Sequence, residues 1–276
     1  MKRLGYDFSS KTIKITLSYS DALEKYKEWT ESLSKFCKKY HICLSHFTKY
    51  LRKNGIYVRN LQNECKFNEH IFDIIDTEEK AYWLGFIFAD GYISSCKENK
   101  KPNYQFEISL KADDVSHLKK FNTFMQHIYN NVKISTVKCG NVECKRCRWS
   151  VRNKHLWETL NSYGCTPNKS LTLQFPKEEF FVDKKLIVDF IRGYWDGDGC
   201  ITYLNKEHTQ MSISALGTES FIKKLNDYFP NKITIFHEKN KSTWTIAAQH
   251  RTAFKTIYYL YENSTIYLDR KYIIYK

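Results

Sequence analysis

The chain has 276 residues and a formal net charge of +14, with 44 Lys and Arg against 30 Asp and Glu. Its 42% hydrophobic content, with ten glycines and four prolines, excludes an intrinsically disordered chain. The excess positive charge favours a polyanionic partner. No segment reaches the ~18 apolar residues of a membrane span, and no signal peptide is evident, so no membrane partner is predicted. Nine cysteines without a disulfide framework predict an intracellular protein of a reducing compartment, a bacterial cytoplasm or an organelle.

The basic excess is concentrated in residues 1–65, which carry 13 Lys and Arg against 6 Asp and Glu. Three helices are predicted there, over Asp21–Trp29, Ser32–Tyr40 and Ser45–Lys53, and Asn54-Gly55 ends the third. The second and third of these helices, joined by a short break, resemble a helix-turn-helix. In that motif the second helix of the pair enters the major groove of DNA. A small three-helix bundle with a solvated basic face is the alternative. The predicted DNA contacts on the third helix are His46, Lys49, Arg52 and Lys53.

The remaining chain repeats one order of predicted elements: helix, two strands, helix, two strands, helix. The first copy occupies residues 70–165 and the second residues 183–276, with a linker at 166–182. The predicted fold class is therefore α+β, a tandem duplication of an αββαββα unit with a small all-α module at 1–65. The helices are expected at 77–91, 113–127, 154–163, 183–198, 218–229 and 251–262, and the strands at 92–96, 104–111, 132–138, 146–152, 200–204, 209–216, 232–238 and 243–248.

The first helix of each copy carries small residues four positions apart. Gly85 and Ala89 share one face of the first of these helices, and Gly193 and Gly197 share one face of the other. Small residues at this spacing allow two helix backbones to approach closely. We therefore expect the two helices to pack against each other along these four residues.

Such packing would bring together the acids at the ends of the two helices, Asp90 and Asp198. Adjacent carboxylates repel each other, and both face the negative end of a helix macrodipole. A bound divalent cation offsets both costs, and hard oxygen ligands suit Mg²⁺. An Asp-Gly pair can also simply end a helix. Its occurrence at matching points of a repeat favours the metal site.

The two segments Trp83–Gly91 and Ile191–Gly199 resemble the paired motifs of the LAGLIDADG homing endonucleases. The resemblance covers roughly residues 70–276. It implies a pseudo-symmetric monomer in which two saddle-shaped antiparallel sheets straddle double-stranded DNA. It also implies that the last acid of each motif, Asp90 and Asp198, is the catalytic residue that binds Mg²⁺.

The same resemblance implies a catalytic lysine near the end of each half, for which Lys169 and Lys271 are the candidates. A basic side chain beside each metal would orient water or neutralise charge during phosphodiester hydrolysis. The sequence departs from the family pattern at Phe88, where the second motif keeps an acid as Asp196, and at Arg192, which replaces a small residue. The family's metal ligand is the later acid, so the first departure leaves the predicted site intact.

Recognition of DNA is expected on the strands. Residues 132–154 contain seven Lys and Arg and only Glu143 as an acid, whereas the matching strand near 208–214 is neutral and polar on one face. Basic residues on one sheet face would contact phosphates and guanines, and the neutral strand either reads bases or is simply solvated. Unequal halves suit a long asymmetric target. The predicted contacts are Lys111, Lys133, Lys138, Lys145, Arg146, Arg148, Arg152, Gln210, Ser212 and Ser214.

Cys139, Cys144 and Cys147 are spaced as C-x₄-C-x₂-C. Zinc would require a fourth ligand, for which His155 is a possible choice, and thiols without a metal are the favoured interpretation. The sequence as a whole predicts a site-specific, Mg²⁺-dependent DNA endonuclease that cuts both strands. Two alternatives stay open: a non-catalytic DNA-binding regulator on the same scaffold, and an RNA-splicing maturase whose partner is intron RNA.

Overall fold

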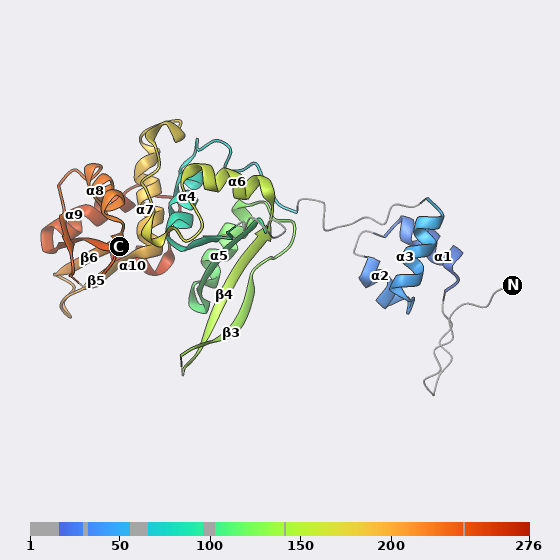
Figure 1. The fold of residues 1–276 in the computed structure, drawn as a ribbon. Helices are drawn as coiled ribbons and strands as arrows, with labels where there is room; N and C mark the ends of the chain where they lie inside the picture. Colours follow the sequence, from blue (N-terminus) through green and yellow to red (C-terminus); the bar gives the residue numbers. More distant parts are fainter. Residues whose placement is uncertain (1–16, 30–32, 56–65, 96–102, 141, 240) are drawn as a thin grey trace. The chain divides into compact units, whose positions relative to one another are not determined.

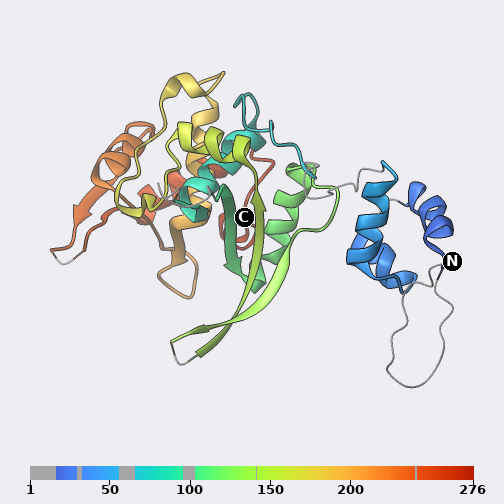
Figure 2. The ribbon, with the colours of Figure 1, turned by 45° about the vertical axis from the view of Figure 1, so that its right-hand side comes forward.

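Buried side chains form two separate cores, one in each of the two units into which the chain divides, Met1–Cys65 and Lys66–Lys276. Figure 1 traces the computed structural model, and Figure 2 shows it turned by 45°. None of its described helices has the length and apolar character that a membrane span requires. The structure describes residues 17–29, 33–55, 66–95, 103–140, 142–239 and 241–276.

The N-terminal unit contains the three predicted helices, α1 (Tyr19–Lys27), α2 (Leu33–Lys39) and α3 (Leu44–Lys53). They enclose an aromatic core in which the rings of Phe36 and Phe47 stack with their centroids 5.7 Å apart. The core is small, and large aromatic side chains bury more apolar area per residue than other types, which suits so short a unit.

The second unit contains the predicted duplication, so the α+β order is confirmed. The first repeat consists of α4 (Glu78–Asp90), β1 (Gly91–Ile93), β2 (Gln105–Lys111), α5 (Val115–Phe124), β3 (Lys133–Cys139), β4 (Val142–Arg152) and α6 (Lys154–Tyr163). The second consists of α7 (Leu186–Asp198), β5 (Gly199–Tyr203), β6 (Met211–Gly217), α8 (Glu219–Asp227), β7 (Thr234–His237), β8 (Trp244–Gln249) and α9 (His250–Tyr261). A further helix, α10 (Asp269–Tyr275), follows α9 within the range 183–276 of the second copy and was not predicted.

Each repeat forms one four-stranded antiparallel sheet, in the order β1-β2-β4-β3 and β5-β6-β8-β7. Alternate residues of β2, such as Phe106 and Ile108, are buried. On β4, Trp149 packs edge-on against Phe121 of α5, with ring centroids 4.9 Å apart. One sheet face therefore packs on helices and the other faces away from them. Figure 2 shows the β3–β4 hairpin extending beyond the other strands.

The helices α4 and α7 lie side by side in the centre of the second unit, and their packing is the most extensive of any pair of elements. Nearly every residue from Ala81 to Phe88 is fully buried, as expected of a helix that is hydrophobic on all sides. A Cβ atom added to Gly85 would lie 1.9 Å from the carbonyl oxygen of Phe190, and one added to Gly193 would lie 1.9 Å from that of Tyr82. Only glycine allows the two backbones to approach this closely.

Candidate metal and nucleic-acid site

The contact between α4 and α7 continues to the ends of both helices, where Asp90 and Asp198 are located. A Cβ atom added to Gly197 would lie 2.3 Å from the Cβ of Ala89 and 3.2 Å from Oδ2 of Asp90. Asp198 follows Gly197 directly, and its negative charge contributes to the raised pKa of Asp90. The structure thus brings together two acids from different repeats.

The electrostatic environment of the two acids disfavours their ionised forms. Burial, and secondly the charge of Asp198, raises the pKa of Asp90 to about 6. Burial by the surrounding protein also raises the pKa of Asp198, although its side chain keeps access to solvent. Two carboxylates that repel each other and face helix C-termini are stabilised by a cation. This all-oxygen donor pair fits Mg²⁺ or Ca²⁺ and does not suit metals that prefer sulfur or imidazole.

The two predicted lysines cap the two helices that carry these acids. Lys169 Nζ donates a hydrogen bond to the carbonyl oxygen of Ala89 at 2.9 Å. Lys271 Nζ donates to the carbonyl oxygens of Trp195 at 2.6 Å and Asp196 at 2.8 Å. A cation at a helix C-terminus satisfies carbonyl groups that lack helical partners and interacts favourably with the macrodipole. The two lysines therefore occupy matching places in the duplicated structure.

The lysine charges also act on the acid pair. Lys271 and Lys169 both lower the pKa of Asp90 and that of Asp198, opposing the effect of burial. Lys271 is only 2% exposed, and this burial lowers its own pKa to about 8. The geometry allows each lysine to hold a helix end in place and to keep a neighbouring acid ionised.

Asp196, the acid that the second motif keeps, lies in the core and not in the acid pair. Its carboxylate accepts hydrogen bonds from the Tyr82 hydroxyl at 2.7 Å, from the Leu268 backbone N–H at 2.7 Å, and from the Tyr261 hydroxyl. These partners belong to α4, to the segment before α10 and to α9, so Asp196 links four parts of the unit. The corresponding Phe88 of the first repeat packs on Phe190 with ring centroids 5.1 Å apart.

Arg192, the second departure from the family pattern, is buried and fully engaged. Its guanidinium donates to Glu78 at 2.6 Å, to Asp189 at 2.8 Å and to the carbonyl oxygen of Ile266 at 3.0 Å. Glu78 also accepts a hydrogen bond from the backbone N–H of Thr265 at 2.7 Å. The long side chain ties both central helices to the C-terminal segment. Pairing with two carboxylates offsets the cost of burying its charge.

The chain is similar to solved LAGLIDADG homing endonucleases. The I-SmaMI enzyme bound to cleaved DNA is 13% identical, with a TM-score of 0.46 over 70% of this chain and 85% of that chain. Variants of I-DmoI are 16% identical, with a TM-score of 0.45 over 71% and 98%. The meganuclease I-AabMI bound to uncleaved DNA is 12% identical, with a TM-score of 0.45 over 70% and 86%. No family model and no curated protein matches the chain.

A basic surface covers the open face of the first sheet. Strand register pairs Arg146 with Lys111, and Arg148 with both Ser109 and Lys133. Alternation along β4 turns these side chains away from the helices, because Cys147 and Trp149 between them are buried. The exposed basic residues of this face are Lys111, Lys133, Arg146, Arg148 and Arg152.

Two of the predicted basic contacts are not on this face. Lys138 pairs with Glu143, and Lys145 pairs with Thr136. Because side chains alternate along a strand, both lysines point to the opposite face of the sheet from Arg146 and Arg148. They lie near the end of the hairpin and are exposed there. The alternation of side chains predicted that only some of the basic residues share one face, and the strand register identifies which ones do.

The open face of the second sheet has no charge from its strands. Ser212 and Ser214 are partly exposed, while Met211 and Ile213 between them are buried. Gln210 precedes β6 and is exposed with the same parity as the two serines. No Lys or Arg occurs in β5, β6, β7 or β8. The two repeats thus present one strongly basic face and one neutral, hydroxyl-bearing face.

The N-terminal unit carries its own basic helix face. In α3, Phe47 and Leu51 are buried in the core of the unit. The four predicted contacts lie on the other side of the helix and are all exposed: His46, Lys49, Arg52 and Lys53. The parts of the predicted module at 1–16, 30–32 and 56–65 lie outside the described residues.

The cysteine cluster does not form a shared site among the described side chains. Cys147 is buried and its thiol lies 3.1 Å from the carbonyl oxygen of Lys111, whereas Cys144 has the opposite parity on the same strand. The side chain of Cys139 lies outside the described residues. His155 lies elsewhere, beside His70.

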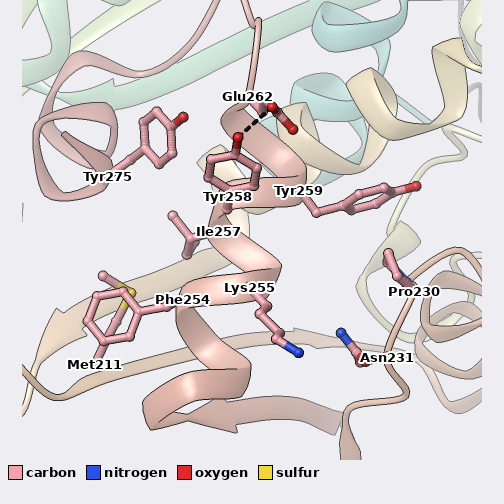
Figure 3. A pocket seen from close by; sticks show the side chains of 10 residues that line it. All are labelled: Met211, Pro230, Asn231, Phe254, Lys255, Ile257, Tyr258, Tyr259, Glu262 and Tyr275. Carbon is pink, nitrogen blue, oxygen red and sulfur yellow. Dashed lines mark hydrogen bonds between the residues drawn. The ribbon is translucent and has the colours of Figure 1, made fainter.

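A separate cavity of about 480 Å³ lies beside α9 and α10 in the second repeat (Figure 3). Its lining includes neither of the paired acids and neither of the helix-capping lysines. It is lined by Met211, Pro230, Asn231, Phe254, Lys255, Ile257, Tyr258, Tyr259, Glu262 and Tyr275.

Proposed function

We propose that the protein is a site-specific DNA endonuclease that uses Mg²⁺ held by Asp90 and Asp198 to hydrolyse phosphodiesters in both strands. The observation that carries this proposal is the close contact of Asp90 with Gly197, the neighbour of Asp198, together with the effect of the Asp198 charge on the pKa of Asp90. When bound, the metal would activate water and stabilise the negative charge of the reacting phosphate. At neutral pH the Asp90 carboxylate, with its pKa of about 6, is ionised and able to bind a cation.

The remaining parts of the site have positioning roles. Lys169 and Lys271 hold the two helix ends through carbonyl groups and supply positive charge beside the acids. Their flexibility is limited by these hydrogen bonds, so they fix the separation of the carboxylates. Because one chain supplies both acids and both lysines, a monomer is sufficient for catalysis.

The unequal sheet faces support a long asymmetric DNA target. The basic face of the first sheet would contact phosphates and guanines, and the neutral face of the second would contact base edges through Gln210, Ser212 and Ser214. The exposed basic face of α3 would extend the contact with DNA, with the N-terminal unit acting as a helix-turn-helix-like module.

A non-catalytic regulator would need the basic faces to bind DNA. It would not need a close pair of carboxylates whose ionised forms are destabilised. A maturase would bind intron RNA, and no contact among the described residues favours RNA over DNA. The nuclease is therefore preferred over the regulator, and the maturase stays the alternative.

The proposal is tested by incubating the purified chain with a library of randomised duplexes in Mg²⁺ and sequencing the cleaved ends. A recurrent long sequence cut in both strands is expected, with no cleavage in a metal chelator. Binding without any recurrent cut would support the regulator instead.

Replacing Lys49, Arg52 and Lys53 together by alanine should weaken DNA binding and reduce its salt dependence. Each lost phosphate contact lowers the slope of log K against log salt by about 0.9, so the slope should fall by up to about 3. Cleavage at saturating protein should change little. Fluorescence anisotropy at several salt concentrations measures the slope. The paired variant Lys223→Ala and Lys224→Ala, on the helix-covered side of the second sheet, is the control, and an equal effect there would contradict the assignment.

Mg²⁺ should stabilise the protein more at pH 7.5 than at pH 5. The pKa of Asp90 is about 6 in the folded protein and near 3.8 in the unfolded protein. Protonation of Asp90 therefore stabilises the folded state at low pH, and this contribution is lost as the pH rises through 6. The loss amounts to at most about 3 kcal/mol without metal. Asp90→Asn should raise the metal-free unfolding free energy at pH 7.5 and remove the Mg²⁺ effect. Urea denaturation measures both quantities, and a less stable metal-free Asp90→Asn protein would refute the prediction.

A further inference from the structure

Two imidazole rings and a carboxylate converge at a place that shares no residue with the acid pair. His70 Nδ1 lies 2.7 Å from Oδ2 of Asp73, and His155 Nε2 lies 2.6 Å from Oδ1 of the same carboxylate. The centroids of the two histidine rings are 4.2 Å apart. Among the described residues, this is the one group of three or more His, Cys, Asp or Glu side chains arranged closely enough to hold a metal ion.

The backbone around these side chains is fixed by other contacts. The Tyr163 hydroxyl of α6 donates to the carbonyl oxygen of Phe72 at 2.8 Å. Asn153 caps α6 by accepting from the backbone N–H of Leu156 at 2.8 Å, and its amide donates to Glu69. The segment before α4 is therefore attached to both ends of α6. The three side chains are held in place by residues that are not themselves ligands, which lowers the entropic cost of ordering a metal site.

We propose that His70, Asp73 and His155 bind a divalent transition-metal ion of the Zn²⁺ class. Each residue offers one ligand atom, and these atoms lie within 4.8 Å of one another. Zinc bonds of about 2.0–2.2 Å to nitrogen and oxygen require only a small outward movement of the two rings. Water would complete a tetrahedral site, since His70 and Asp73 are exposed and His155 is half-buried.

The surroundings resemble those of metal-binding histidines. The other ring nitrogen of His70, Nε2, lies 3.9 Å from Oε1 of Glu69. This distance is too long for a hydrogen bond, but a small rotation of either side chain would form one, and a carboxylate hydrogen-bonded in this way orients a metal-bound imidazole and increases its basicity. Imidazole ligands favour Zn²⁺ over Mg²⁺, so this site and the all-oxygen acid pair differ in the metals they select.

Bound metal would join the first segment of the second unit to α6, which follows the basic strand β4. The ion thus has a structural role and takes no part in the proposed hydrolysis. Its presence or absence can be established even if the protein cuts no DNA.

The test is calorimetric titration of ZnCl₂ into the full-length protein after removal of metals by a chelator. One Zn²⁺ per chain is expected to bind at this site, and the thermal midpoint should rise on binding. His70→Ala and His155→Ala should each lower the affinity at least about tenfold, because loss of an outer partner alone typically costs 10–100-fold. Both histidines have solvent access, so circular dichroism should show that the variants fold.

Matched controls separate this site from other ligands in the chain. His46→Ala removes an exposed imidazole of α3, and the double variant Asp90→Asn and Asp198→Asn removes the acid pair. Both should bind Zn²⁺ as the wild type does. The proposal is overturned if the wild type binds no Zn²⁺, or if the double variant His70→Ala and His155→Ala binds it equally well. In that case Asp73 simply accepts hydrogen bonds from two imidazoles.

Discussion

Replacing Asp90 and Asp198 together by asparagine should abolish DNA cleavage and leave DNA binding intact. Asparagine keeps the size of the side chain and removes the charge that attracts the metal. Loss of an outer partner of a metal ligand already costs up to about 100-fold in affinity or activity, so loss of both ligands should reduce the rate by at least that factor. The basic side chains that would bind DNA lie on the strands and are not changed in this variant. Cleavage assays in Mg²⁺ and anisotropy with the same duplex measure the two effects.

The appropriate control is Asp113→Asn, which removes an exposed acid just before α5. It should cut DNA at the wild-type rate. Asp196→Asn tests a different property, because three donors converge on that buried carboxylate and its loss should lower stability by about 1–3 kcal/mol. If the double variant of Asp90 and Asp198 cuts as well as the wild type, the proposed metal site is wrong.

The duplication and the meeting of the two acids were accessible from the sequence because their signals are local. Alternating strands, helix caps and small residues four positions apart each occupy a few neighbouring residues. Since the pattern occurs twice, Asp90 and Asp198 could be paired without knowledge of any long-range contact. Lys169 and Lys271 were indicated by the resemblance to the LAGLIDADG family and not by a local pattern of their own.

Features that depend on distant partners could not be predicted. The role of Asp196 depends on Tyr261 and Leu268, and that of Arg192 depends on Glu78, all far away in the chain. No pattern of neighbouring residues predicts these contacts.

Strand register was equally inaccessible. The exclusion of Lys138 and Lys145 from the basic face depends on how β3 and β4 pair, since a shift of one residue moves every side chain to the opposite face. The group of His70, Asp73 and His155 likewise arises only when the segment before α4 packs on α6.

Gly193→Ala should both destabilise the protein and impair cleavage. The added Cβ would lie 1.9 Å from the carbonyl oxygen of Tyr82, and a backbone atom cannot rotate away as a side chain can. Overpacking costs up to about 3 kcal/mol, whereas alanine gains only about 1 kcal/mol in helix propensity. A net loss of about 2 kcal/mol in the free energy of unfolding is expected from urea denaturation.

The effect on activity follows from the same clash, because α4 and α7 can relieve it only by separating. Separation displaces Asp198 relative to Asp90, and a misplacement of about 1 Å costs on the order of 100-fold in rate. Gly85→Ala meets the carbonyl oxygen of Phe190 at the matching point and should behave alike. Ser116→Ala, on the exposed face of α5, should change stability by less than about 0.5 kcal/mol. Full stability and activity in both glycine variants would show that the close contact of α4 and α7 does not set the geometry of the acid pair.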